Sequence, residues 1–157
     1  MPAKPEGMVP SKPCAVLDAM IWARGLIARN PEAAPATLIQ AWTAGRFRVL
    51  VSGELLEEIA GTLLELGAEP DDVVRAISLL AAENQVVAIK HQRMGCADEE
   101  DDHLIETAVT GHAGYLVSED RAVQELPMHV REYLTRRGIQ VWRAHEFSAY
   151  LEHLTAD

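Results

Sequence analysis

Short, continuously apolar runs alternate along the chain with longer amphipathic stretches. Runs without polar alternation are typical of parallel strands that are covered on both faces. The runs that predict strands are CAVLD (14–18), FRVLVS (47–52), VVAI (86–89), GYLVS (114–118) and IQVW (139–142). The stretches that predict helices are 20–29, 35–44, 53–66, 71–83, 102–112, 129–137 and 145–154.

This order predicts an α/β fold, a three-layer sandwich around a central, mainly parallel five-stranded sheet with right-handed crossovers. Four glycines lie at or just past predicted helix ends, where a C′ glycine is expected: Gly45, Gly67, Gly111 and Gly138. In open sheets of this kind, ligands bind outside the carboxyl ends of the strands, where the strand order reverses.

The length of 157 residues and an apolar content of 48% fit one domain, which we expect over 14–157. Residues 1–13 carry four prolines and no apolar core, so we expect a flexible tail there. No apolar run approaches the ~20 residues of a membrane span, so the sequence predicts a soluble, cytoplasmic protein with no membrane partner. Cys14 and Cys96 form no CxxC pair and are expected to be free thiols.

The net charge of −10, from 24 acidic residues against 14 Lys and Arg, argues against a protein that coats nucleic acid. It leaves room for an enzyme that holds phosphate through metal ions. The last third has a local positive bias that could border a phosphate backbone, although a solvated surface is the favoured interpretation. Its arginines are Arg121, Arg131, Arg136, Arg137 and Arg143.

Two candidate site residues, Asp18 and Asp120, lie at or just beyond the ends of predicted strands. A charge directly after four apolar residues lies either at the rim of the sheet or, at high cost, unpaired in the core. Each aspartate could instead cap the helix that follows it. Ser118 could act as a cap as well, or it could donate to a carboxylate or to a metal-bound water.

Helical projections select two further acids. In the stretch 53–66, Glu58 lies closer to the apolar arc than Glu54 or Glu57, and a solvated helix face is its alternative. In the run DEEDD (98–102), Asp101 projects onto the middle of the buried arc of the following helix and Asp102 just outside it. Asp101 is therefore the third candidate in chain order after Asp18 and Glu58, and Asp102 could assist.

Four carboxylates gathered in one place repel one another, and a hard divalent cation is the usual remedy. Other chemistries lack their signatures. The six histidines contain no HExxH, and the chain has no GxxxxGK[ST], no GxGxxG and no GxSxG. Zinc hydrolysis, the common nucleotide-binding loops and a serine nucleophile elbow are therefore not indicated.

Taken in order, these segments resemble a PIN-domain ribonuclease, the fold of VapC-like toxins of toxin–antitoxin modules, from about residue 14 to 147. AVLDAMIWARGL resembles the opening strand with the first acid, and FRVLVSGELLEEI the second strand with the glutamate on Glu58. DEEDDHLIETAVTGHAGYLVSEDRAV resembles the stretch that carries Asp101 and Asp120, and GIQVWRAHEF the last strand.

The resemblance implies a metal-dependent endoribonuclease that hydrolyses RNA phosphodiester bonds with Mg²⁺ or Mn²⁺. Asp18, Glu58, Asp101 and Asp120 would be the catalytic metal ligands, with Ser118 and Asp102 as supporting groups. Asp18 and Asp120 would bind the ion directly. The implied partners are an RNA substrate, a cognate antitoxin protein and a second copy of the chain in a homodimer.

The first motif departs from the family, which usually has Asp-Thr-Asn or Asp-Ser-Asn where this chain has Asp18-Ala19-Met20. This departure motivates a second hypothesis, a catalytically weakened PIN domain that binds RNA or protein. A receiver-type phosphorylation domain is a third. It would need a second acid at the end of the first strand and a Lys ending the fifth, and the chain has neither.

Overall fold

The computed structural model describes residues 12–155. The predicted tail therefore lies, as far as residue 11, outside the described residues. All five predicted strands are present and pair in parallel, which confirms the α/β class. They are β1 (Cys14–Leu17), β2 (Arg48–Ser52), β3 (Gln85–Val87), β4 (Tyr115–Val117) and β5 (Gln140–Trp142).

All seven predicted helices are present, with ends within two residues of the prediction. They are α1 (Ala19–Ile27), α2 (Ala34–Thr43), α3 (Gly53–Glu65), α4 (Pro70–Glu83), α5 (Asp102–Thr110), α7 (Met128–Arg136) and α8 (Ala144–Thr155). Two short elements were not predicted, the 3₁₀ turn η1 (Glu99–Asp101) and the four-residue helix α6 (Arg121–Gln124). Single turns are too short to show a hydrophobic period.

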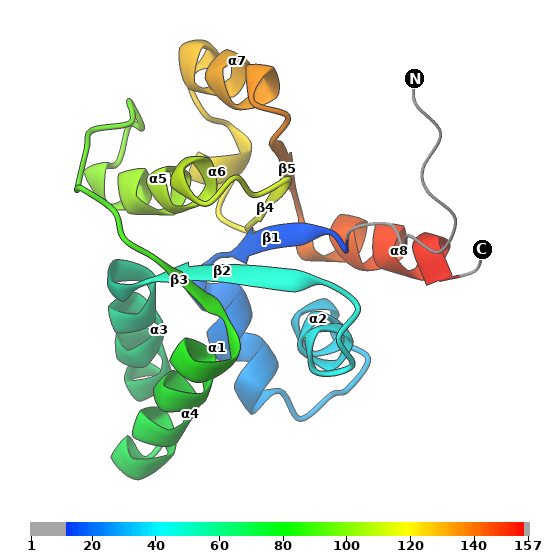
Figure 1. The fold of residues 1–157 in the computed structure, drawn as a ribbon. Helices are drawn as coiled ribbons and strands as arrows, with labels where there is room; N and C mark the ends of the chain where they lie inside the picture. Colours follow the sequence, from blue (N-terminus) through cyan, green and yellow to red (C-terminus); the bar gives the residue numbers. More distant parts are fainter. Residues whose placement is uncertain (1–11, 156–157) are drawn as a thin grey trace.

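The strand order is β3-β2-β1-β4-β5, so the chain winds outward from β1 in one direction and then returns to the other side of β1. Right-handed crossovers then put α1 to α4 on one face and α5, α6 and α7 on the other. Figure 1 shows these two groups of helices on opposite sides of the strands. The strand order reverses between β1 and β4, and a crevice is expected at their carboxyl ends.

The backbone ladder continues past the strands at this carboxyl edge. The Asp18 amide donates to the carbonyl of Val117 at 2.9 Å, and the Ser118 amide donates to that of Trp142 at 3.0 Å. The residues that follow β1 and β4 are therefore held side by side by main-chain bonds. The main-chain atoms that carry the side chains of Asp18 and Ser118 are therefore fixed in position.

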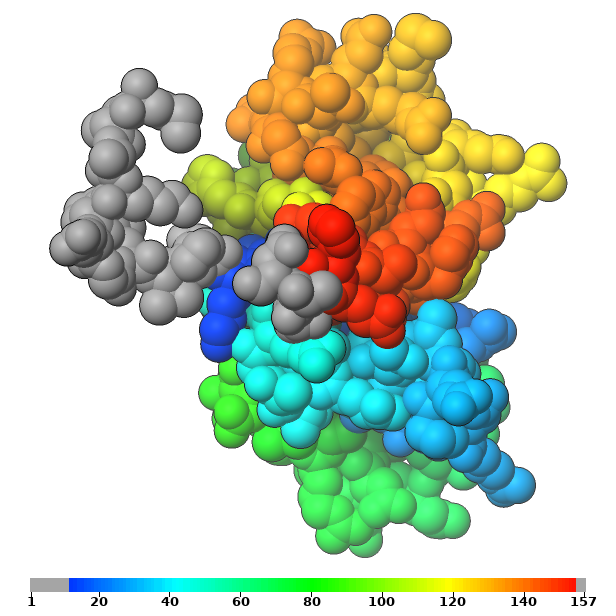
Figure 2. All heavy atoms as spheres, turned by 90° about the vertical axis from the view of Figure 1, so that its right-hand side faces the viewer, coloured from blue at the N-terminus to red at the C-terminus, as the bar shows by residue number. Residues whose placement is uncertain are grey.

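The core lies on both faces of β1, whose residues Ala15, Val16 and Leu17 are fully buried. Aromatic edge contacts tie the helices to it, with ring centroids 5.1 Å apart for Trp22 and Trp42 and 5.2 Å for Phe47 and Phe147. Helix α8 packs against α2, and Figure 2 shows their surfaces in contact. Helix α5 contacts β1 from the opposite side of the sheet, so both faces of the central strand are covered, as its unbroken apolar sequence predicts.

Three of the four predicted C′ glycines, Gly45, Gly67 and Gly138, have positive φ. The prediction for Gly111 was wrong in position, because it is the C-cap residue with φ −87° and His112 takes the left-handed conformation at φ 59°. A glycine is still needed at 111, since a Cβ there would collide with the Leu50 side chain. Close helix–sheet approach, rather than a left-handed turn, explains this residue.

Within residues 12–155, Cys14 and Cys96 are both free thiols. None of the helices in that part of the chain combines the length and the apolar character needed to cross a bilayer.

Candidate active site

Asp18 lies at the carboxyl end of β1, where the strand order reverses. It is the N-cap residue of α1, but its side chain makes no capping hydrogen bond. Its Oδ2 instead accepts a 2.6 Å bond from the hydroxyl of Ser118, which is completely buried. The capping alternative for Asp18 was therefore wrong, and its carboxylate is directed toward the end of β4.

Asp120 lies two residues beyond β4 and caps α6, because its Oδ1 accepts from the Ala122 amide at 3.0 Å. Its own amide donates to the Ser118 hydroxyl at 3.0 Å. Ser118 therefore links Asp18 and Asp120, donating to the first and accepting from the second. The cap uses Oδ1 alone, so capping leaves the Asp120 carboxylate able to bind a ligand through its other oxygen.

Glu58 projects from the second turn of α3, and its side chain is 46% exposed. Its Oε2 lies 2.6 Å from Nε2 of His103, which belongs to the first turn of α5. Burial lowers the pKa of His103, but the hydrogen bond and charge of Glu58, with the charge of Asp18, raise it above its ordinary value. The sequence analysis missed His103, since its partner is 45 positions away and no local spacing marks the pair.

Helices α3 and α5 are fastened to each other beneath this contact. Oγ1 of Thr107 lies 2.9 Å from Oγ of Ser52 and 2.7 Å from the His103 carbonyl oxygen. Ser52 ends β2 and caps α3 through the Leu55 amide. Both hydroxyl residues are fully buried, so the helices that carry Glu58 and His103 have a fixed relative position.

Asp101 is half-buried at the end of η1, and its side chain makes no capping bond to α5. Burial and the charges of Asp120, Asp98, Asp18 and Glu58 raise the pKa of Asp101 to about 6. Burial also raises the pKa of Asp18, and the charges of Glu58 and Asp120 add to it, although the Ser118 bond opposes them. All four predicted acids therefore contribute to one repulsive field.

The burial of Asp101 and Asp102 is the reverse of what the helical projection predicted. Asp102 is 4% exposed and Asp101 is the less buried of the two. The projection extended the 100° step of the α-helix back through a segment that is 3₁₀, where each residue turns by about 120°. Asp102 accepts from the Cys96 amide at 3.0 Å and from Nε of Arg93 at 2.6 Å.

These bonds give Asp102 a place in a loop rather than among the other acids. Burial alone would raise the pKa of Asp102, but the bonds from Cys96 and Arg93 outweigh it and the pKa is lowered. The Asp102 carboxylate thus stabilises the segment 88–98 that leads into η1. Any support that Asp102 gives to the site would therefore act through this loop.

A buried glutamate that the sequence did not indicate holds the same loop. Glu106 is 3% exposed, and its two oxygens accept from the amides of Lys90 at 2.6 Å and Gln92 at 2.8 Å. Between these amides, His91 has a positive φ of 62° and lies 3.0 Å from Glu54. An unpaired buried acid on an apolar helix face is costly, and that rule could have marked Glu106 for a structural role.

The arginines of the last third are mostly engaged locally. Arg121 pairs with Glu125 at 3.1 Å, and Arg143 lies 3.9 Å from Glu119. The guanidinium of Arg137 stacks over Tyr133 at 4.3 Å. Arg121 and Arg143 nevertheless flank the Asp120 corner on exposed positions, since α6 begins at one and β5 ends just before the other.

The donor chemistry of the four acids fits a hard cation such as Mg²⁺, which prefers carboxylate oxygens and water. Burial is the main cause of the raised pKa values of Asp18 and Asp101, and the charges of neighbouring acids add to it; such an ion would neutralise those charges. Over residues 12–155, however, no group of three or more His, Cys, Asp or Glu side chains is arranged to hold a metal ion. The carboxylates thus share a field without forming a closed ligand shell.

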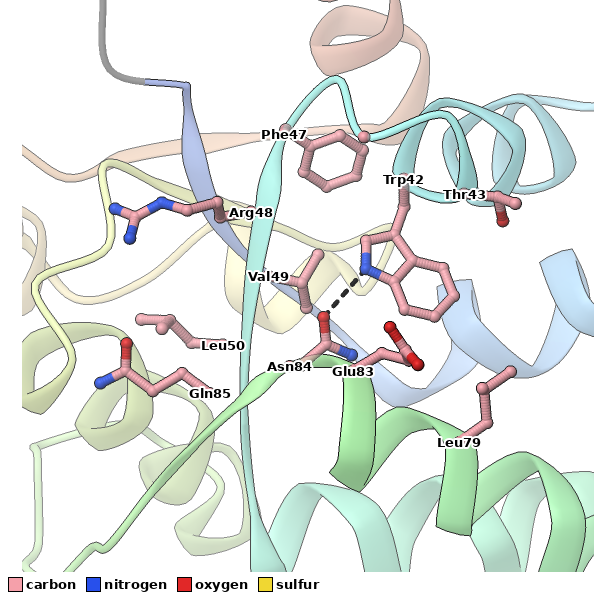
Figure 3. Close-up of a pocket in the computed structure, with 11 residues that line it drawn as sticks. Trp42, Thr43, Phe47, Arg48, Val49, Leu50, Leu79, Glu83, Asn84 and Gln85 are labelled. Atoms are coloured by element: carbon pink, nitrogen blue, oxygen red, sulfur yellow. Dashed lines mark hydrogen bonds between the residues drawn. The ribbon is translucent and has the colours of Figure 1, made fainter.

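A hollow of about 460 Å³ lies at the opposite end of the sheet, near the start of β2 and β3. Figure 3 shows the Trp42 indole on its wall, held by a 2.9 Å bond to Asn84, with Leu79 nearby. None of the four acids lines it. This hollow and the four candidate acids are therefore at different ends of the molecule.

Residues 14–122 match the sequence profile of the PIN domain, and this match covers more than half of the chain. The chain belongs to the PIN-domain family. The matched segment contains Asp18, Glu58, Asp101 and Asp120, and the suspected resemblance is confirmed. No curated protein matches the PIN-domain chain in sequence.

Solved structures match the PIN-domain chain in fold. One is a chain of the crystal structure of VapBC2 from Rickettsia felis bound to a DNA fragment from its promoter. The TM-score is 0.54 at 8% identity, and the match covers 83% of this chain and 98% of the other. At this identity the likeness concerns the fold, and it confirms the predicted PIN-like architecture.

Proposed function

We propose that this PIN-domain protein is a metal-dependent endoribonuclease that hydrolyses phosphodiester bonds of RNA. The observation that carries the proposal is the hydrogen bonding of Ser118, which joins Asp18 to Asp120 at the reversal of strand order, within one electrostatic field of four acids. Open α/β sheets bind ligands at this position. An oxygen-only donor set there is suited to Mg²⁺ or Mn²⁺.

When bound, such an ion would lower the pKa of a coordinated water and offset the negative charge that repels phosphate. Asp18 and Asp120 would hold it, since they follow neighbouring strands at the same edge of the sheet and Ser118 joins them. Ser118 would keep Asp18 oriented. Glu58 and Asp101 would complete the shell or orient its waters, and Asp102 would support the loop before Asp101.

Arg121 and Arg143 would contact the RNA backbone beside the Asp120 corner. Both are exposed, and pairs between exposed side chains are worth only ~0–1 kcal/mol, so a phosphate can displace their glutamate partners. The fold likeness to a chain of VapBC2 supports a toxin role with a cognate antitoxin. A homodimer and a cytoplasmic location belong to the same proposal.

The test is RNA cleavage with Mg²⁺, Mn²⁺ or EDTA, beside thermal melting under the same conditions, for the wild type and D18N. We expect metal-dependent cleavage and a metal-dependent rise in melting temperature, both lost in D18N, because a ligand that binds the folded state raises its midpoint. E57Q, which alters an exposed acid of the same helix as Glu58, is the matched control. Cleavage by D18N equal to the wild type would remove Asp18 from the role.

A second candidate function, a weakened PIN domain that binds RNA or a protein, is favoured by one specific observation. Ala19 and Met20, which follow Asp18, have side chains that supply no hydrogen bonds to its carboxylate. For this function, RNA would bind to the wild type without cleavage, and millimolar Mn²⁺ would leave the melting temperature unchanged.

A further inference from the structure

His103 and Glu58 form a contact that the proposed function leaves unused. The imidazole is 18% exposed, whereas the glutamate it meets is 46% exposed. Among the described residues, Nδ1 of His103 is buried without a hydrogen-bond partner, so the ring makes a single polar side-chain contact, through Nε2. That contact is with one carboxylate oxygen, Oε2, of Glu58.

The main chain that carries the His103 ring is held in place by hydrogen bonds. Thr107 lies 2.7 Å from the His103 carbonyl oxygen and 2.9 Å from the hydroxyl of Ser52, which caps the helix of Glu58. Both partners of the contact are therefore set on helices whose spacing is fixed by buried hydroxyls. A long glutamate side chain on an exposed helix face would otherwise sample many rotamers.

We propose that His103 is a positioning residue that holds Glu58 in the orientation needed to bind the cation. Nε2 contacts Oε2 of Glu58, whose charge acts on both Asp18 and Asp101. The inference rests on the proposed function, because it concerns the same metal site. Groups that hydrogen-bond to metal ligands contribute 10- to 100-fold to metal affinity as a rule, by removing the disorder of the ligand.

An alternative role for His103 is competition, in which its imidazole and the ion compete for the carboxylate of Glu58. The two roles predict changes of opposite sign. Loss of a positioning group weakens metal binding, whereas loss of a competitor strengthens it. The fixed base of His103 and its low exposure favour positioning, since a competitor must move away when the ion arrives.

The experiment measures Mn²⁺ affinity of the full chain from the electron paramagnetic resonance signal of free Mn²⁺. We expect H103L to bind Mn²⁺ about tenfold more weakly than the wild type. H103Q, whose amide can donate from near the position of Nε2, should regain most of this affinity. H145A, at an exposed histidine of α8, should match the wild type.

A double-mutant cycle separates positioning from a general structural effect. If His103 acts through Glu58, then H103L should cause no further loss of Mn²⁺ affinity in an E58Q background. An equal loss in both backgrounds, or tighter binding by H103L alone, overturns the inference. A wild type that binds no Mn²⁺ and cleaves no RNA overturns the proposed function itself.

A measurement on the wild type covers the case in which H103L does not fold. The ¹⁵N chemical shift of His103 Nε2 should report a hydrogen bond to Glu58 both before and after saturation with Mg²⁺. Loss of that bond on saturation would mean that the imidazole yields to the ion, and the positioning role would be wrong.

Discussion

The hydroxyl of Ser118 donates a 2.6 Å hydrogen bond to Oδ2 of Asp18. The two residues are one hundred positions apart in the sequence and meet where the strand order reverses. The same hydroxyl accepts from the amide of Asp120 at 3.0 Å. One small side chain thus sets the relative position of the acids after β1 and β4. It also opposes the effect of burial, which raises the pKa of Asp18.

Replacement of Ser118 by alanine should therefore affect both stability and metal binding. We expect S118A to lower the free energy of unfolding by ~1–3 kcal/mol, since a buried bond to a carboxylate is lost. We expect Mn²⁺ affinity to fall about tenfold, because Asp18 is no longer oriented. Denaturant unfolding and Mn²⁺ titration measure the two effects.

S148A, at a half-buried serine of α8, is the matched control and should change neither quantity. Wild-type Mn²⁺ affinity in S118A would show that Asp18 needs no help from Ser118.

Asp101 predicts a specific dependence of stability on pH. Its pKa is raised from 3.8 to about 6, so between these values the folded chain holds a proton that the unfolded chain releases. The contribution of this carboxyl to stability is present below pH 3.8 and is lost as the pH rises through about 6. D101N carries no charge at any pH and should avoid this loss.

In metal-free buffer we expect D101N to melt ~2–4 °C above the wild type near pH 7.5, which corresponds to about 1 kcal/mol after allowance for solvent screening of this half-buried group. Near pH 4 the two proteins should melt together. E100Q, at the exposed neighbouring acid, should follow the wild type at both pH values. A gain in melting temperature of equal size at pH 4 and pH 7.5 would mean that the ionised carboxylate of Asp101 is not the source of the gain.

Glu106 should be essential to the segment 88–98, because its buried carboxylate accepts from the amides of Lys90 and Gln92. E106A leaves both amides without that acceptor, and we expect the free energy of unfolding to fall by ~2–4 kcal/mol. Hydrogen exchange at Lys90 and Gln92 should accelerate more than at β1. These quantities come from denaturant unfolding and from exchange followed by NMR.

E57Q removes the charge of an exposed helical acid and should leave both stability and exchange unchanged. Protection of the Lys90 and Gln92 amides in E106A, at the level of the wild type, would contradict the assignment of Glu106 as the anchor of this loop.

The amino-acid sequence by itself determined the elements of this protein and the approximate place of its acids. Unbroken apolar runs such as Ala15–Leu17 can be stable only where both faces are covered, and so they specify a parallel sheet. The sheet in turn specifies that Asp18 and Asp120 emerge at the same edge. Local patterns sufficed here because the order of apolar and polar residues within one segment reflects which of its faces are buried.

Only the tertiary structure decided which side chains meet. The 3₁₀ turn before α5 exchanged the burial of Asp101 and Asp102, because a change from 3.6 to 3.0 residues per turn alters the direction of each side chain. His103 meets Glu58, and Glu106 meets the amides of Lys90 and Gln92, across separate segments of the chain. Such contacts depend on the spacing of packed helices, which no periodicity within one segment encodes.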